Sequence, residues 1–167
     1  MQTTRNRVIA IDPGYDRCGV AILERSSGKD ALLYSSCITT DAKKPFSERL
    51  CYVGEKIKIL IQKYKPDACA IENLYFNTNQ KTAMHVAEVR GMIMYLAAES
   101  KIPVHEYTPP QVKLAVTGWG KSDKKQMAHM IPMIIQVKKR IALDDEYDAV
   151  ALGITYLSSV RSKKIFL

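Results

Sequence analysis

The chain has 167 residues, of which 47% are hydrophobic and 25% are charged, a size and composition that suit one globular domain able to bury its own core. Its 25 lysines and arginines outnumber its 17 acidic residues, and the resulting formal net charge of +8 favours a polyanionic partner such as a nucleic acid. No apolar stretch reaches the ~18 residues that span a bilayer, and no hydrophobic signal region follows the polar start MQTTRNR, so the composition argues against a membrane or secreted protein and predicts a cytoplasmic one.

The first forty residues have the pattern of three short strands. Apolar or alternating residues occupy positions 7–12, 18–24 and 31–39, and turn-forming residues such as Pro13-Gly14 separate them. Because the connections are short, we expect an antiparallel meander.

The rest of the chain alternates between helix and strand patterns. Apolar residues recur every three or four positions from 45 to 64, which predicts a helix that ends at Lys65-Pro66. Strands followed by alternating strand and helix predict a mixed sheet covered by helices, an α/β fold in a single domain over residues 1–167. The later expected elements are a strand at 68–72, a helix from about 79 to 100, a strand at 103–107, a short helix at 111–116, a helix at 122–135 that Pro132 interrupts or kinks, and a helix at 144–159.

Basic residues gather in the last third of the chain. Any one cluster is consistent with an ordinary solvated surface. Three clusters within about forty residues favour a surface that follows phosphates. They are Lys121, Lys124 and Lys125; Lys138, Lys139 and Arg140; and Arg161, Lys163 and Lys164.

The four cysteines have no spacing that suits a zinc site or a redox pair. Each stands singly among apolar neighbours, which predicts small buried hydrophobic side chains. They are Cys18, Cys37, Cys51 and Cys69.

Four acidic residues stand at the ends of apolar segments. Asp12 ends the strand at 7–12 and Glu72 ends the strand at 68–72, while Asp145 and Asp148 are three apart on the last helix and so share a face. A structural role is open to some of them, since Asp favours turns and acids stabilise the first turn of a helix. Glu72 is harder to explain in that way, because Glu is not a turn residue.

A cluster of carboxylates is stable only if a cation offsets their repulsion. Oxygen ligands without a Cys/His set suit Mg²⁺ or Mn²⁺ rather than zinc. Three or four carboxylates can hold two such ions ~3.5–4 Å apart, an arrangement that cleaves phosphodiesters. A basic chain with an acidic centre therefore predicts metal-dependent cleavage of a nucleic acid.

Five segments of the chain carry a recognisable pattern: IAIDPGYDRCGVAI, IENLYFNTN, VRGMIMYLA, VHEYTPPQVKLAVTGWGKSDKKQMAHM and DDEYDAVALGIT. In their order and nearly in their spacing they resemble the RuvC family of bacterial Holliday junction endonucleases. The resemblance covers most of the chain from residue 8 to about 157. It implies an RNase H-like mixed five-stranded sheet flanked by helices, a homodimer, dependence on Mg²⁺ with two ions per site for which Mn²⁺ can substitute, and paired symmetric nicking of four-way junction DNA in recombination and repair. It leaves open whether branch-migration proteins of the RuvA and RuvB type must be present.

The resemblance also assigns the site residues. It places the metal-binding, catalytic carboxylates at Asp12, Glu72, Asp145 and Asp148, with Asp144 as the alternative to Asp145. Lys113 and Lys124 match basic positions near the scissile phosphate, where they would neutralise charge as the bond breaks.

Other residues are expected to bind the DNA without holding the metal. Tyr75 matches an aromatic position that stacks on bases at the strand exchange point, and Phe76 beside it is the alternative. An ordinary place in the core is open to either ring. Lys121 and Lys125 are expected to bind phosphates. The helix at 79–100 would form the centre of the dimer, although packing on its own sheet is an alternative.

Three other functions remain possible at this point. A catalytically inactive junction-binding protein is disfavoured by the complete acidic set, because acids weaken the binding of phosphates. Another RNase H-like nuclease would keep the same carboxylates. An actin-like sugar or acetate kinase could use DPGYDRCGVAI as a phosphate-binding hairpin, but such kinases need two domains of this kind.

Overall fold

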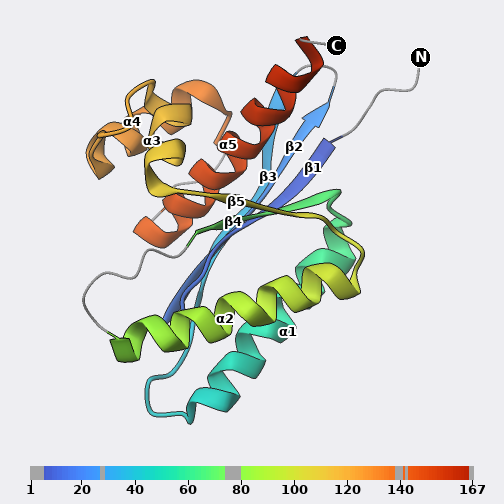
Figure 1. The fold of residues 1–167 in the computed structure, drawn as a ribbon, viewed down its shortest axis with the longest axis vertical. Helices are drawn as coiled ribbons and strands as arrows, with labels where there is room; N and C mark the ends of the chain where they lie inside the picture. Colours follow the sequence, from blue (N-terminus) through green and yellow to red (C-terminus); the bar gives the residue numbers. More distant parts are fainter. Residues whose placement is uncertain (1–5, 27–28, 74–79, 138–140, 142, 166–167) are drawn as a thin grey trace.

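The computed structural model describes residues 6–26, 29–73, 80–137, 141 and 143–165, and Figure 1 shows their arrangement. Within them, strands come first and helices alternate with strands afterwards, as the sequence predicts. The elements are β1 (Asn6–Asp12), β2 (Arg17–Ser26), β3 (Lys29–Thr39), α1 (Phe46–Tyr64), β4 (Ala68–Glu72), α2 (Gln80–Glu99), β5 (Val104–Tyr107), α3 (Pro109–Thr117), α4 (Lys124–Ile134) and α5 (Asp144–Ile165).

The strands form a five-stranded sheet in the order β3-β2-β1-β4-β5. The pairs β1–β2 and β2–β3 are antiparallel and make the expected meander, whereas β4 is parallel to both β1 and β5. The predicted mixed five-stranded α/β fold is therefore confirmed.

Helices cover both faces of the sheet, with α1 and α2 on one side and α3, α4 and α5 on the other (Figure 1). Successive strand residues point to opposite faces. In β1, Ile9 and Ile11 pack in the core under α1 and α2, while Val8 and Ala10 pack in the core under α5. Because both faces are buried, the central strands are apolar almost throughout.

This alternation also fixes the face on which the acidic strand ends lie. Asp12 comes two residues after Ala10, so its side chain points to the same face as those of Val8 and Ala10. Glu72 likewise comes two residues after Ala70, which packs under α5. Both carboxylates are thus placed on the side of the sheet that α5 covers.

Two helices begin differently from the prediction because of their caps. Thr108 and Gln111 form a reciprocal capping box, so α3 begins at Pro109 with prolines in its first positions, where their missing N–H groups cost nothing. Asp123 and Gln126 form the same box for α4, which begins at Lys124.

The expected interruption at Pro132 is wrong, since α4 runs through this residue to Ile134. The proline removes one hydrogen bond of the preceding turn, but Met127 and Ile131 of that turn are buried in the core and keep the helix in place. The last helix is also longer than predicted and extends to Ile165. None of the described helices is both long and apolar enough to cross a bilayer.

The prediction for the cysteines holds for only two of them. Cys18 and Cys69 are buried in the sheet, but Cys37 is half-buried and Cys51 is exposed on α1. Cys51 lies off the face of α1 that packs on the sheet, which carries Val53 and Ile57.

Candidate functional site

Asp12 and Glu72 lie side by side at the end of the sheet. Strands β1 and β4 are parallel neighbours in which Ile11 stands opposite Ile71, so the next residue of each strand is an acid at the same level. The carboxyl ends of parallel strands are where ligand crevices open in α/β sheets. The two predicted acids from distant parts of the chain are therefore brought together.

The start of α5 reaches this point because β2 has no side chain there. Gly19 pairs with Asp12 in the antiparallel ladder. A β-carbon at Gly19 would overlap the backbone carbonyl of Asp145, so only glycine lets the first turn of α5 rest directly on the strand. This contact places Asp145 and Asp148 over the end of β1.

The electrostatics of Asp12 show that the four acids influence one another. Burial, followed by the charges of Glu72, Asp148 and Asp145, raises the pKa of Asp12 to about 8, although Lys124 opposes the shift. Burial also raises the pKa of Glu72, and Asp148 adds to this effect. Ionising all these groups together is unfavourable unless positive charge is supplied.

Lys124 supplies part of that positive charge. Its Nζ lies 3.4 Å from Oδ2 of Asp144 and 3.5 Å from Oδ2 of Asp148. Burial lowers the pKa of Lys124, but the two carboxylates outweigh burial and raise it overall. Burial raises the pKa of Asp148, Lys124 lowers it, and the neighbouring acids Asp145 and Asp144 add to the net upward shift.

Asp144 and Asp145 have different surroundings. The side chain of Asp144 is 71% exposed and pairs with Lys124, whereas that of Asp145 is 21% exposed. Asp145 is one of the three carboxylates whose charges are the main ones that raise the pKa of Asp12. Its buried Oδ2 lies 3.1 Å from Nε of Arg17, without the geometry of a hydrogen bond.

The predicted lysines occupy different positions around the acids. Lys113 on α3 lowers the pKa of Glu72, so it lies on the same side of the molecule as the carboxylates. Lys121 and Lys125 are exposed on the loop before α4 and on its first turn. A hollow of about 70 Å³ beside Lys124 is lined in part by Asp144, Tyr147 and Asp148.

Some predicted residues lie outside the part of the chain that the structure describes. These are the stacking candidates Tyr75 and Phe76 and the basic cluster Lys138, Lys139 and Arg140.

The donor set fits a hard divalent cation. All four predicted ligands are carboxylates, and the charges of the other three oppose the ionisation of Asp12, a repulsion that a bound dication would relieve. Within the described residues, no three acidic, His or Cys side chains yet stand close enough together to hold an ion. The side chains would therefore have to rotate inward, with Lys124 releasing Asp148.

Two residues of structural importance for the site escaped the sequence prediction. Gly19 could not be identified from the sequence, because its contact with Asp145 joins distant segments. The role of Arg49 could have been suspected, since a charged residue there falls on the apolar face of the predicted helix at 45–64. Its Nη2 donates to the carbonyl of Tyr15 at 3.0 Å and to Asp16, and its Nε donates to Oγ1 of Thr40 at 2.9 Å.

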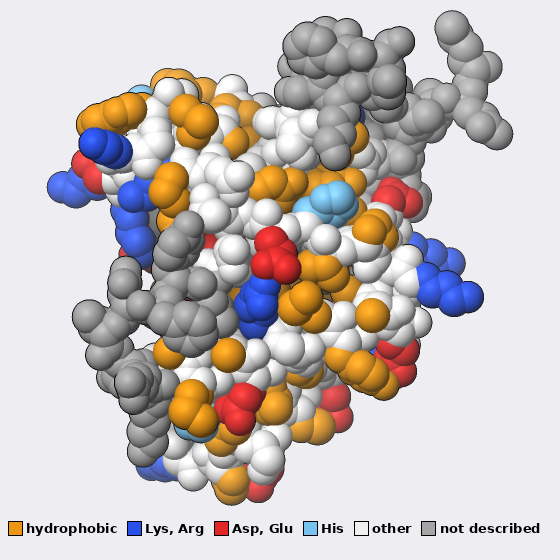
Figure 2. Space-filling view, viewed as in Figure 1, with side chains coloured by type: hydrophobic (Ala, Val, Ile, Leu, Met, Phe, Trp, Pro, Cys, Tyr) orange, Lys and Arg blue, Asp and Glu red, His pale blue; other side chains and the backbone are white. Residues whose placement is uncertain are grey.

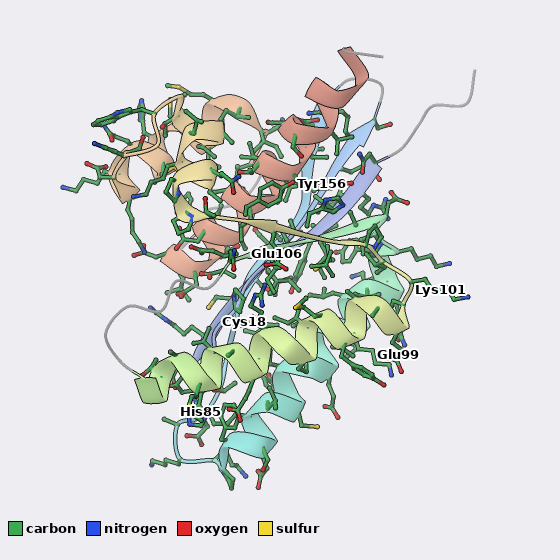
Figure 3. All side chains as sticks on the ribbon, in the orientation of Figure 1. Cys18, His85, Glu99, Lys101, Glu106 and Tyr156 are labelled. Atoms are coloured by element: carbon green, nitrogen blue, oxygen red, sulfur yellow. The ribbon has the colours of Figure 1, made fainter. Side chains whose placement is uncertain are left out.

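Arg49 thus anchors the turn that follows Asp12. Near the N-terminal end of α2 (Figure 3), His85 stacks on Phe46 with ring centroids 4.0 Å apart and contacts Tyr15 edge-on. The turn between β1 and β2 is therefore held from both helices on its side of the sheet. A cavity of about 390 Å³ lies next to Arg49, and none of the four predicted carboxylates is among its lining residues.

Comparison with known proteins identifies the family of the chain. Residues 8–156 match the family model described as crossover junction endodeoxyribonuclease RuvC. The chain is 42% identical over 147 residues to the protein of that name from Thermosipho melanesiensis, a region that covers 88% of this chain and 94% of the relative.

Solved structures agree with this match. The structure of Thermus thermophilus RuvC in complex with Holliday junction substrate has a TM-score of 0.88 and 27% identity, covering 95% of this chain and 96% of that one. The yeast mitochondrial Holliday junction resolvase, at 15% identity and a TM-score of 0.65 over 97% of this chain and 86% of that one, shows the shared fold alone. From the family match over residues 8–156 and the extent of the sequence identity, the chain belongs to the crossover junction endodeoxyribonuclease RuvC family.

Proposed function

We propose that this protein is a metal-dependent endonuclease that resolves Holliday junctions by nicking two strands of like polarity, in DNA recombination and repair. Membership of the RuvC family supports this proposal. So does the similarity to a RuvC structure solved with a junction substrate. The observation that carries it is that the charges of Glu72, Asp145 and Asp148, which come from two other segments of the chain, each raise the pKa of Asp12.

In this proposal the four carboxylates hold two Mg²⁺ ions, for which Mn²⁺ can substitute. Asp145 is preferred to Asp144 because it is the less exposed of the two and acts on Asp12. Bound there, divalent ions supply an activated water and stabilise the leaving oxygen of a phosphodiester. The carboxylates themselves fix the positions of the ions, since Asp12 and Glu72 stand on rigid strands.

The lysines of the site would act on the DNA. Lys124 and Lys113 lower the pKa of Glu72, so their charge already reaches the carboxylates. With junction DNA bound, they are placed to neutralise the scissile phosphate as charge develops on it. Lys121 and Lys125 would hold neighbouring phosphates, and either Tyr75 or Phe76 would stack on a base at the exchange point.

The assembly is also part of the proposal. The protein would act in the cytoplasm as a single-domain chain that forms a homodimer, because two nicks in strands of like polarity need two sites related by a twofold axis. Helix α2 offers exposed apolar side chains for that contact, including Met84 and Tyr95. Proteins of the RuvA and RuvB type are possible partners.

The test is incubation of a four-way junction and a plain duplex, labelled on each strand in turn, with Mg²⁺ or with EDTA. Symmetric nicks in the junction that require Mg²⁺, with the duplex left intact, are the expected result. Equal cutting of the duplex would indicate another RNase H-like nuclease. Tight junction binding without any nicking would indicate a scaffold.

A further inference from the structure

A large aromatic side chain stands exposed between the two helices that carry the lysines of the site. Trp119 lies in the loop that joins α3, which holds Lys113, to α4, which begins with Lys124. It is 58% exposed, although an indole ring is among the side chains that gain most from burial.

The backbone on which Trp119 stands is held firmly. Its N–H donates to Oγ1 of Thr117 at 3.1 Å, and its carbonyl accepts from N–H and Oγ of Ser122 at 3.2 and 2.5 Å. Gly118 takes the left-handed conformation (φ 77°) that ends α3, and the Asp123 capping box starts α4 directly afterwards. The exposed ring is therefore presented on an ordered loop, which keeps the entropic cost of binding low.

The surroundings of the ring indicate the chemistry of its partner. Lys121 and Lys125 are exposed on the same loop and on the following turn, and Lys124 reaches from this turn to the acidic site. Figure 2 shows basic and hydrophobic side chains next to one another over the region of α3 and α4, at the upper left. An aromatic face among lysines suits a polyanion that carries flat rings, which describes single-stranded or distorted DNA.

We propose that Trp119 stacks on an unpaired base of the junction strand whose phosphates Lys121 and Lys124 hold. This inference rests on the proposed function and adds a contact for a base next to the scissile phosphate. The lysines fix the backbone of the strand, and the ring takes a base that pairing does not protect. Because every base has a π-face, the contact adds affinity without requiring one sequence.

The experiment uses the fact that Trp119 is the one tryptophan in the chain. Its fluorescence, excited where tyrosine does not absorb, is followed while a four-way junction is added to the full-length protein in EDTA, so that nothing is cleaved. We expect quenching of the emission and protection of the ring from acrylamide as the junction saturates the protein. A duplex of the same length should produce neither effect at equal occupancy.

Substitutions distinguish the loss of a base contact from a general loss of folding or of DNA binding. Trp119→Ala is expected to weaken junction binding roughly 5- to 150-fold, the range that corresponds to one stacked base, while Trp119→Phe keeps most of the affinity. The matched control is Met133→Ala, which removes an exposed apolar side chain from the opposite end of α4 and should leave affinity unchanged. Melting temperatures of all three variants should equal that of the original protein, since both side chains are exposed.

Different results would contradict different claims. If the junction binds but the tryptophan emission and its acrylamide quenching do not change, and Trp119→Ala binds as tightly as the original protein, the stacking role is wrong and the proposed function stands. Protection of the ring by a RuvA- or RuvB-type protein, without protection by DNA, would replace the base with a protein partner. If the original protein does not bind a junction at all, the proposed function fails, and this inference fails with it.

Discussion

Gly19 of β2 lies directly against the backbone carbonyl of Asp145, so that a β-carbon at this position would overlap the first turn of α5. Gly19 is also the ladder partner of Asp12. The absence of one side chain thus determines how near the acids of the last helix come to the acid of the first strand.

Gly19→Ala should push the start of α5 away from the sheet. We expect a loss of ~1–3 kcal/mol in the free energy of unfolding, as for other overpacked sites, together with slower nicking. Urea denaturation and a junction cleavage assay measure the two effects. Gly91→Ala is the control for the stability measurement alone, because α2 is the helix proposed to form the dimer contact. A β-carbon there would meet nothing within 4 Å, and in the interior of α2 alanine should stabilise by ~0.5–1 kcal/mol. Equal behaviour of the two variants would show that Gly19 is not under steric constraint.

The stability of the metal-free protein should depend on pH through Asp12. Its pKa is 3.8 in the unfolded chain and is raised to about 8 in the folded chain by burial and the other carboxylates. A raised pKa means that the contribution of the group to stability is complete below 3.8 and is lost as the pH rises towards about 8. The free energy of unfolding should therefore fall across this range.

Asp12→Asn removes the titrating group, so the free energy of unfolding should fall less steeply with pH. Each unit of difference between the folded and unfolded pKa corresponds to ~1.4 kcal/mol. Urea denaturation at a series of pH values, with EDTA and with Mg²⁺, measures it. Mg²⁺ should restore stability to the original protein at high pH and have little effect on Asp12→Asn. Parallel pH profiles for the two proteins in EDTA would count against the raised pKa.

The two neighbouring acids at the start of α5 should differ in their effect on cleavage. Asp145→Asn removes a half-buried carboxylate that acts on Asp12, and nicking should fall by at least about 100-fold, as when one group that stabilises a transition state is lost. Asp144→Asn removes an exposed carboxylate and should lower the nicking rate much less. Initial nicking rates at saturating Mg²⁺ compare them, and a greater loss for Asp144→Asn would reverse the assignment.

Arg49→Ala should lower the free energy of unfolding, because Arg49 connects α1 to the turn after Asp12 through hydrogen bonds. Asp16 is largely exposed, so the ion pair itself contributes little, and the loss in Arg49→Ala comes from packing and from the hydrogen bonds to Tyr15 and Thr40, ~1–3 kcal/mol in all. Chemical denaturation measures this loss, and cleavage should then require more Mg²⁺.

A control for Arg49 lies on the same helix. Glu48→Ala breaks an exposed pair with Lys44 and should change stability by no more than ~0.5 kcal/mol. If Arg49→Ala were equally mild, the turn would be held by its other contacts.

The elements of the fold, and Asp12 and Glu72 within them, could be predicted because they depend on local patterns. The alternation in β1 and β4 and the turn residues between strands are visible in short windows of sequence. Their positions at strand ends follow from the same windows. The family resemblance then supplied the pairing of these acids with Asp145 and Asp148.

Other features depend on contacts between distant segments and could not be predicted in this way. The role of Gly19 requires the path of α5 across the sheet, and the burial of Arg49 requires the turn that it anchors. Pro132 does not break α4 because Met127 and Ile131 of the preceding turn pack in the core, and this tertiary contact outweighs local propensity. Cys51 is exposed because α1 presents only one face to the sheet.

The most direct test of the central claim is to measure both nicking and binding of a four-way junction by Glu72→Gln. The substitution keeps the shape of a side chain at the end of β4 and removes its charge. If Glu72 and its three neighbours form the metal centre, nicking at saturating Mg²⁺ falls by at least about 100-fold. Junction affinity in EDTA should stay the same or increase, since an acid is lost from a basic surface. Nicking at nearly the original rate by this variant would contradict the account.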